Sequence, residues 1–248
     1  MPEAQTIDEV IEALDGVLDE ARRDGSRLGY FAALYRKVTI EVKKGIAAGY
    51  FDDGPRMERL DVLFANRYLV AVDAYRRQEA AIGSWDLAFS ASRAWMPLVL
   101  QHLLLGMNAH INLDLGIAAA LAAPGSELVE LRDDFVRIND LLGSMVAQVK
   151  RELAEIWRPL AFLDRISGNI EDVGVNFSMA RARDSAWDLA TSLADQGEDA
   201  RAAVIADRDR WTVGFGHHLW RPPLGAVALF LIRIGERRDV RENIEILM

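Results

Sequence analysis

The sequence contains no cysteine among its 248 residues, which excludes disulfide bonds, a thiol nucleophile and cysteine-ligated metals. It also lacks an excess of basic residues, because 38 Asp and Glu outweigh 29 Lys and Arg and give a formal net charge of −9. Nucleic-acid phosphates and anionic membranes both attract clustered Lys and Arg. We therefore expect neither nucleic acid nor a membrane as a partner.

Signatures of the common cofactor enzymes are missing as well. The sequence carries no nucleotide or flavin fingerprint, no P-loop, no nucleophile elbow and no ferritin-like pair of E-x-x-H motifs. Without cysteine it has no iron–sulfur signature. The opening M-P-E-A-Q-T-I-D-E-V is acidic and lacks the basic and apolar regions of a signal peptide. These absences favour a cytoplasmic protein without such cofactors.

Strand signals are also absent, since no period-two pattern or hairpin dipeptide occurs. Apolar residues instead recur at helical spacing along the chain. We predict an all-α fold, a single domain over residues 1–248 with about eight to ten helices around a buried central helix. Helices are expected over about residues 7–24, 27–48, 55–80, from Gly83-Ser84 onward, 94–123, 126–157, 170–195, 198–220 and 224–237, with a short apolar segment at 160–166.

The predicted central helix, about residues 94–123, organises the chain. Residues 94–113 contain no Asp, Glu, Lys or Arg, and about 20 apolar residues can cross a bilayer. Lipid would penalise the polar side chains in this stretch, whereas a protein interior can pair them. We interpret it as a core helix that Pro97 kinks or restarts. Its polar residues are Gln101, His102, Asn108, His110 and Asn112.

His110 and Asp114 lie one helical turn apart on the central helix. The carboxylate can orient the imidazole for acid–base chemistry. Alternatively, both side chains can bind one divalent metal, because i and i+4 ligands converge. A third interpretation is a buried pair that only satisfies its own hydrogen bonds.

The tight turn at Pro124-Gly125 predicts which residues face this pair. If the helices on either side of the turn pack antiparallel, Asn139 lies opposite His110 and Asp134 lies near Asp114. Two close carboxylates would need a proton, a cation or a metal between them. We therefore name His110, Asp114, Asn139 and Asp134 as candidate catalytic residues, with His110 and Asp114 as the candidate metal ligands.

Asn112 points about 200° away from His110 on an ideal helix. It joins the His110 site only if the helix is distorted near Gly106 or Gly116, and otherwise serves a second interface. Other polar residues in apolar surroundings are candidates for binding a substrate. With Asn112, they are Arg36, Glu58, Asp61, Asn66, Arg67, His102, Arg181, Trp187 and His218.

The charged members of this set have two interpretations. Buried arginine is normally paired with carboxylate, so Arg36 or Arg181 could join Glu58 or Asp61 and lock helices together. The same arginines could instead clamp an anionic substrate. His217 and His218 end a predicted helix, where a charged imidazole is favoured. They form a surface pair, or His218 reaches the central site.

The chain resembles a bacterial family of uncharacterised proteins, a domain of unknown function. The resemblance is carried by G-Y-F-A-A-L-Y-R-K-V-T, D-G-P-R-M-E-R-L-D-V-L-F-A-N-R-Y-L, L-Q-H-L-L-L-G-M-N-A-H-I-N-L-D-L and D-F-V-R-I-N-D. It implies a shared design around His110, Asn112 and Asp114, and carries no known activity. H-I-N-L-D is also similar to the H-x-x-x-D zinc-ligand element of zinc-dependent phospholipase C and P1-type nucleases, whose other ligands this sequence lacks.

Three functions remain open. The first is an enzyme with a buried polar pocket centred on His110 and Asp114, which performs acid–base or metal-assisted hydrolysis, elimination or isomerisation on a small organic substrate. The second is a non-catalytic protein that binds a small molecule or a partner. The third is a structural interaction protein. We expect a small-molecule ligand, and the sequence neither requires nor excludes a homo-oligomer.

Overall fold

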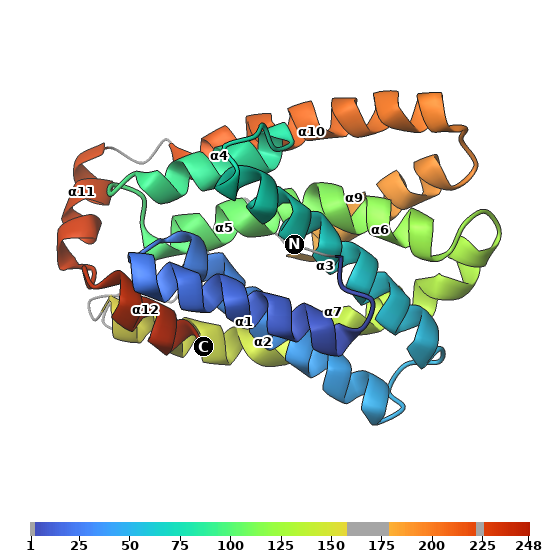
Figure 1. The fold of residues 1–248 in the computed structure, drawn as a ribbon, viewed down its shortest axis with the longest axis horizontal. Coiled ribbons are helices and arrows are strands. Elements are labelled where there is room, and N and C mark those ends of the chain that lie inside the picture. The colour runs from blue at the N-terminus through green and yellow to red at the C-terminus, as the bar shows by residue number, and fades with distance from the viewer. Residues whose placement is uncertain (1–2, 158–178, 222–225) are drawn as a thin grey trace.

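The computed structural model describes residues 3–157, 179–221 and 226–248, and within these ranges it is all-α with no strand (Figure 1). The predicted fold class is thus confirmed. The helices are α1 (Ile7–Asp24), α2 (Leu28–Ala47), α3 (Gly54–Arg76), α4 (Gly83–Arg93), α5 (Val99–Ala109), the π-helical turn η1 (His110–Asp114), α6 (Leu115–Ala122), α7 (Glu127–Ile156), α9 (Met179–Ala194), α10 (Glu198–Trp220), α11 (Ala226–Gly235) and α12 (Val240–Leu247). The predicted segment 160–166 and the start of the predicted helix at 170–195 lie outside the described residues.

Helix boundaries follow from local capping chemistry. The Thr6 side chain accepts a hydrogen bond from the backbone N–H of Glu9 at the start of α1, and Gly25 ends that helix with φ of 63°. Asp53 caps α3 in the same way, and Pro55 occupies its first turn. These ends lie within a few residues of the predicted ones because the caps are encoded locally.

The central helix comprises α5, η1 and α6, which continue without a break over Val99–Ala122. It begins after Pro97, as a restarted helix, and the Gln101 side chain accepts a hydrogen bond from the Leu98 N–H. By length and composition it could cross a membrane, a test that a core helix also passes, and 94% of its most apolar window is buried inside the protein. Figure 1 shows it in the middle of the molecule, between α10 on one side and α1 and α2 on the other.

Buried apolar side chains form two large clusters on this helix. One involves α1, α2, α3 and α4 and includes Leu14, Tyr30 and Trp85. The other involves α6, α7 and α9 and includes Leu113 and Phe135. Phe64 and Met107 pack against both clusters. His110, which stacks on Phe64, therefore lies where the two clusters meet.

Gly106 allows α2 to approach the central helix closely. A Cβ at this position would lie 2.4 Å from Cγ and 2.9 Å from Cβ of Phe31, which are atoms too near the backbone to move away. We expect Gly106→Ala to lower the free energy of unfolding by about 1–3 kcal/mol through overpacking. Gly16→Ala is the control, because nothing lies within 4 Å there and alanine favours a helix by about 1 kcal/mol. Urea denaturation measures both, and a stabilised Gly106→Ala would contradict the close packing.

Candidate functional site

Asp114 is a fully buried carboxylate held by two N–H donors from different helices. Arg67 Nε on α3 donates to Oδ1 at 2.6 Å, and Trp85 Nε1 on α4 donates to Oδ2 at 2.7 Å. Burial alone would raise the pKa of Asp114. The positive charge of Arg67 and the hydrogen bonds from His110 and Trp85 outweigh burial, so the pKa lies below its ordinary value. Asp114 is therefore an anion anchored in the core.

His110 lies beside this anion in an aromatic enclosure. Its Nδ1 is 3.5 Å from Asp114 Oδ2, and its ring stacks on Phe64 with centroids 3.5 Å apart and an interplanar angle of 10°. Tyr35 packs edge-on at 4.4 Å. Burial lowers the pKa of His110, and Asp114 opposes this effect only in part. The imidazole is thus neutral, and a proton on Nδ1 facing the carboxylate leaves the Nε2 lone pair free.

The backbone at this pair is π-helical. The N–H of Leu115 donates to the carbonyl oxygen of His110, one residue farther than in an α-helix. Single π-helical turns inside α-helices are rare and occur frequently at functional sites. This turn includes both His110 and Asp114, so the distortion coincides with the candidate acid–base pair.

A cavity of about 400 Å³ opens beside His110. Its walls come from α2, α3, the central helix, α7 and α9, and most of the lining side chains are apolar. The α7 wall includes the exposed residues Val146 and Lys150, so the cavity reaches the surface there. The volume is near the lower end of the range of about 300–1,000 Å³ for small-molecule sites.

Several residues that line this cavity carry buried polar atoms without a hydrogen-bond partner among the described residues. Asp61, His110 and Asn139 line it, and each carries one such atom: Oδ2, Nε2 and Oδ1 respectively. The Tyr35 hydroxyl and Arg183 Nε complete the group. Buried polar atoms normally have partners, and each exception needs a reason. All five residues line the cavity, so a ligand there would lie close to every one of them.

Asp61 differs from Asp114 because, in the part of the chain that the structure describes, no cation pairs with it. Burial, with a smaller contribution from the charge of Glu58, raises the pKa of Asp61 to about 7. Burial also raises the pKa of Tyr35 well above its ordinary value, and the charge of Asp61 adds to this shift. The cavity thus places a neutral imidazole and a carboxyl group that titrates near neutral pH in one apolar enclosure.

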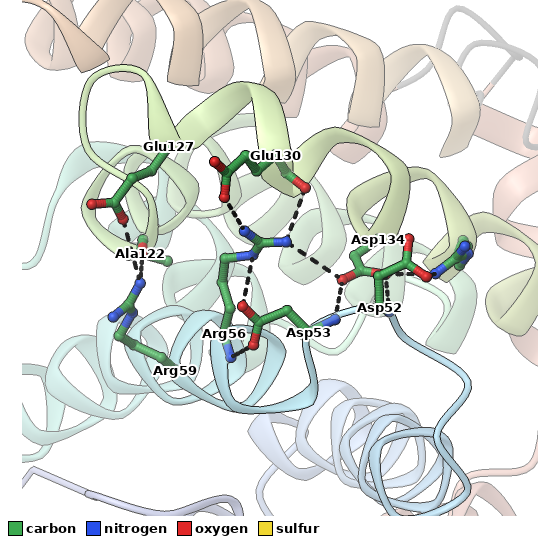
Figure 2. Close-up of polar contacts among 9 residues, drawn as sticks. Asp52, Asp53, Arg56, Arg59, Ala122, Glu127, Glu130 and Asp134 are labelled. Atoms are coloured by element: carbon green, nitrogen blue, oxygen red, sulfur yellow. Dashed lines mark hydrogen bonds and ion pairs between the residues drawn. The ribbon is translucent and has the colours of Figure 1, made fainter.

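The predicted proximity of Asp134 to Asp114 is wrong. Asp134 accepts hydrogen bonds from the backbone N–H groups of Asp52 and Asp53 at 2.8 and 3.0 Å (Figure 2). It also pairs with Arg137 at 2.9 Å. It therefore holds the start of α3. Asp114 pairs with Arg67, which is more than three turns farther along that helix, on the order of 20 Å away. Asn139 does line the cavity with His110.

Figure 2 shows what the neighbourhood of Asp134 does instead. Arg56 of α3 donates to the carbonyl oxygen of Glu130 at 2.9 Å and lies 3.3 Å from its carboxylate. Arg59 bonds the carbonyl oxygen of Ala122 at the end of the central helix. These contacts join α3 to the turn between α6 and α7. Asp134 belongs to this structural network and not to the cavity.

The predicted pairing of Arg36 with Glu58 or Asp61 is also wrong. Arg36 Nε lies 2.5 Å from Asp15 Oδ1 on α1. Glu58 accepts from the backbone N–H of Ile7 at 3.2 Å, and Asn66 exchanges two hydrogen bonds with the backbone of Ala4. Arg36, Glu58 and Asn66 therefore attach α1 to α2 and α3. Of this predicted group, Asp61 alone faces the cavity.

Asn112 lies at the interface of the central helix with α10, on the side of the helix that its spacing from His110 predicted. Its side chain donates to Asn108 Oδ1 at 2.9 Å, and Asn108 donates to the carbonyl oxygen of Thr212 on α10 at 2.9 Å. Arg208 on the same helix donates to the carbonyl oxygen of Asn112. Although the helix is distorted at η1, Asn112 binds α10 and not the His110 site.

The remaining candidates lie away from the cavity. His102 is buried against Tyr30, and burial lowers its pKa to about 3. His217 and His218 are exposed on α10, and His218 Nδ1 contacts the carbonyl oxygen of Gly214. Trp187 packs on Phe135 and under the Arg132 guanidinium, and Arg181 is exposed. Of the two interpretations of His217 and His218, the structure therefore favours the surface pair, and His218 does not reach the central site.

The geometry does not favour a metal at His110 and Asp114. Both carboxylate oxygens already accept short hydrogen bonds from Arg67 and Trp85. A positively charged Arg67 occupies the place that a cation would take. Within the described part of the chain, no three His, Asp or Glu side chains come together as possible metal ligands. The likeness to zinc enzymes therefore gains no geometric support.

Sequence reasoning did not select Trp85, Arg183 or Tyr35 as residues of the site. Nothing in the sequence indicates that Trp85 would reach Asp114 from another helix. The sequence pattern does indicate that Arg183 points inward, because it shares a helical face with Ala186 and Ala190, which are buried. Arg181 lies on a different face. Helical phase could have selected Arg183 as the inward arginine of this segment.

Fold and site together define an all-α protein with a small-molecule-sized cavity beside a buried His–Asp–Arg network. Residues 7–222 match the model of a family of unknown function (DUF5995), which covers most of the chain, and the protein therefore belongs to this family. The predicted membership in an uncharacterised family is confirmed. No curated protein and no solved structure matches the chain.

Proposed function

We propose that the protein is an enzyme that binds a small, mostly apolar organic molecule in the cavity and uses His110 as a general base. The observation that carries this proposal is the free Nε2 of His110 in a cavity that also collects the unpaired polar atoms of Asp61, Tyr35 and Asn139. Apolar walls with a few convergent polar groups are typical of a substrate site.

The network behind His110 prepares it for proton transfer. The Asp114 carboxylate faces Nδ1, and Arg67 and Trp85 fix that carboxylate from the other side. When Nε2 takes a proton, the imidazolium forms beside an anion that is already in place. Such preorganised charge stabilises the transition state without rearrangement of the site.

Asp61 supplies the complementary acid. With its pKa raised to about 7 by burial, the carboxyl group is partly protonated near neutral pH, where a general acid is most effective. His110 would remove a proton from the substrate, and Asp61 would donate one to the developing anion. Isomerisation and elimination are the reaction classes that this pair supports, and the Asn139 amide oxygen would orient a substrate donor.

The base is tested with 5-nitrobenzisoxazole, a small aromatic probe. Removal of its ring C–H proton by a base breaks the N–O bond and yields a coloured nitrile phenolate. We expect the protein to accelerate this reaction and His110→Gln to lose about 100-fold or more of the acceleration. A rate equal to that of buffer, or equal rates in the wild type and His110→Gln, would contradict the proposal.

His102→Gln is the matched control, because His102 is buried in the same helix but does not line the cavity. It should retain the wild-type rate. The pH profile identifies the base. With His110 as base, its lowered pKa moves the loss of rate to a pH below that at which an ordinary histidine gains a proton. If Asp61 were the base, the rate would fall as that group is protonated near pH 7.

A non-catalytic carrier is the second candidate. The apolar character of most lining residues favours it, because a carrier needs only burial of its ligand. A carrier would bind small apolar compounds equally well in the wild type and His110→Gln, and neither protein would accelerate the proton-transfer reaction.

A further inference from the structure

Arg183 is a feature of the cavity that the acid–base chemistry leaves unexplained. Its side chain is 3% exposed and lines the cavity from α9. Its Nη2 donates to the carbonyl oxygen of Phe135 at 2.5 Å, and its guanidinium lies 4.5 Å from the centre of the Phe135 ring. Within residues 3–157, 179–221 and 226–248, no carboxylate forms an ion pair with it.

A buried guanidinium that forms no ion pair among the described residues is costly to the fold, and the charge of the neighbouring Asp184 offsets burial only in part. Burial lowers the pKa of Arg183 to about 10, so the group is still charged at neutral pH. Arginines that serve only to hold helices together are normally neutralised by a carboxylate, as Arg67 is by Asp114. The Nε–H of Arg183 is also buried and has no acceptor within the described ranges of the chain. A bound anion would supply both the negative charge that Arg183 lacks and an acceptor for its Nε–H.

We infer that the cavity takes a small, mostly apolar molecule with one carboxylate, which Arg183 binds while the apolar part lies along the walls. The inference rests on the proposed function and narrows its substrate class. The planar guanidinium can grip a carboxylate through two parallel N–H···O bonds. Lys150, on the exposed wall of the same cavity, adds a second positive charge.

The size and walls of the cavity restrict the rest of the molecule. A volume of about 400 Å³ accommodates a single ring or a short chain rather than a lipid with long tails. The walls that Phe31, Phe64 and Leu115 contribute bury the apolar part. With the carboxylate at Arg183, the rest of the ligand lies in the same cavity that His110 and Asp61 line.

Calorimetric titration with 4-phenylbutanoate and 4-phenylbutanamide tests the inference, because the two probes share a skeleton and differ in charge. At about pH 6 the acid probe is ionised. We expect the carboxylate to bind more tightly than the amide. Arg183→Met should weaken carboxylate binding by about 10- to 100-fold and leave the amide unchanged. Arg132→Met, which removes a cation stacked on Trp187 outside the cavity, should change neither affinity.

The outcomes distinguish failure of the carboxylate assignment from failure of the proposed base. Equal affinities for the two probes, or unchanged carboxylate binding in Arg183→Met, would overturn the carboxylate assignment while the base activity of His110 could still stand. Carboxylate binding that depends on Arg183, together with full activity in His110→Gln, would support the assignment and overturn the proposed base. Failure of the wild-type protein to bind either probe would overturn the assignment. Circular dichroism checks that Arg183→Met is folded, which we expect because the variant removes an uncompensated buried charge.

Discussion

Arg67→Met should lower the free energy of unfolding by about 3–5 kcal/mol at neutral pH. The substitution leaves the Asp114 carboxylate, which is 1% exposed, without its counter-charge in the core. Urea denaturation followed by circular dichroism measures the loss. Adding Asp114→Asn should recover much of it, because a neutral amide needs no cation.

The pH dependence of this loss has a defined sign. In the wild type, the pKa of Asp114 lies below its ordinary value, so the contribution of this carboxylate is present above the ordinary carboxyl pKa and is lost as the pH falls. In Arg67→Met the buried carboxyl group gains a proton more readily. The difference between the two proteins should therefore shrink toward acid pH.

Arg36→Met is the matched control for Arg67→Met. Arg36 also joins an aspartate on another helix, but Asp15 is 42% exposed and Arg36 is 24% exposed. Water screens such a pair, so we expect a loss of less than about 1 kcal/mol. If both variants lost the same free energy of unfolding, burial of Asp114 would not be the reason that its ion pair with Arg67 is strong.

Asp61→Asn should stabilise the protein above neutral pH, by about 4 kcal/mol at pH near 8. The pKa of Asp61 is raised to about 7 from an ordinary value of 3.8. Between these values the folded protein binds a proton that the unfolded chain does not, so the stability of the wild type falls as the pH rises and levels off above about 7. Asparagine does not ionise, and the variant avoids this loss.

Denaturation of wild type and Asp61→Asn at about pH 4 and about pH 8 measures the effect. The two proteins should be nearly equal at the acid pH, where both carry a neutral group at this position. The exposed Asp133→Asn serves as the control and should show no such divergence. A constant difference at both pH values would contradict the raised pKa of Asp61. A more stable but inactive Asp61→Asn would further indicate that the buried acid is retained for function.

The fold class could be predicted from the sequence because helix formation here is mostly local. Capping by Thr6 and Asp53, the glycine at position 25 and the break at Pro97 act within a few residues of the chain. The uncharged stretch before Asp114 could be buried only in the core or in lipid, and its polar side chains favoured the core. The central helix was therefore predicted to within five residues at its start.

The site was predicted only in part because its partners come from distant elements. The four-residue spacing on one helix predicted the contact of His110 with Asp114. The antiparallel packing expected across the turn at Pro124-Gly125 predicted that Asn139 lies near His110, and both line the cavity. Register failed for Asp134, because α7 turns this residue toward the backbone at the start of α3. Arg67 was selected as a substrate-binding residue, but it neutralises Asp114.

The sequence alone determined that the protein is helical, that one helix is buried, and that an imidazole and a carboxylate share a turn of it. These features depend on neighbouring residues and on helical periodicity. Only the tertiary structure decided that Arg67 and Trp85 hold Asp114. It also decided that Asp61 and Arg183 line one cavity, each without an ion-pair partner among the described residues. Charge and pKa in a protein interior depend on which side chains meet across helices, and that packing is set by the whole chain.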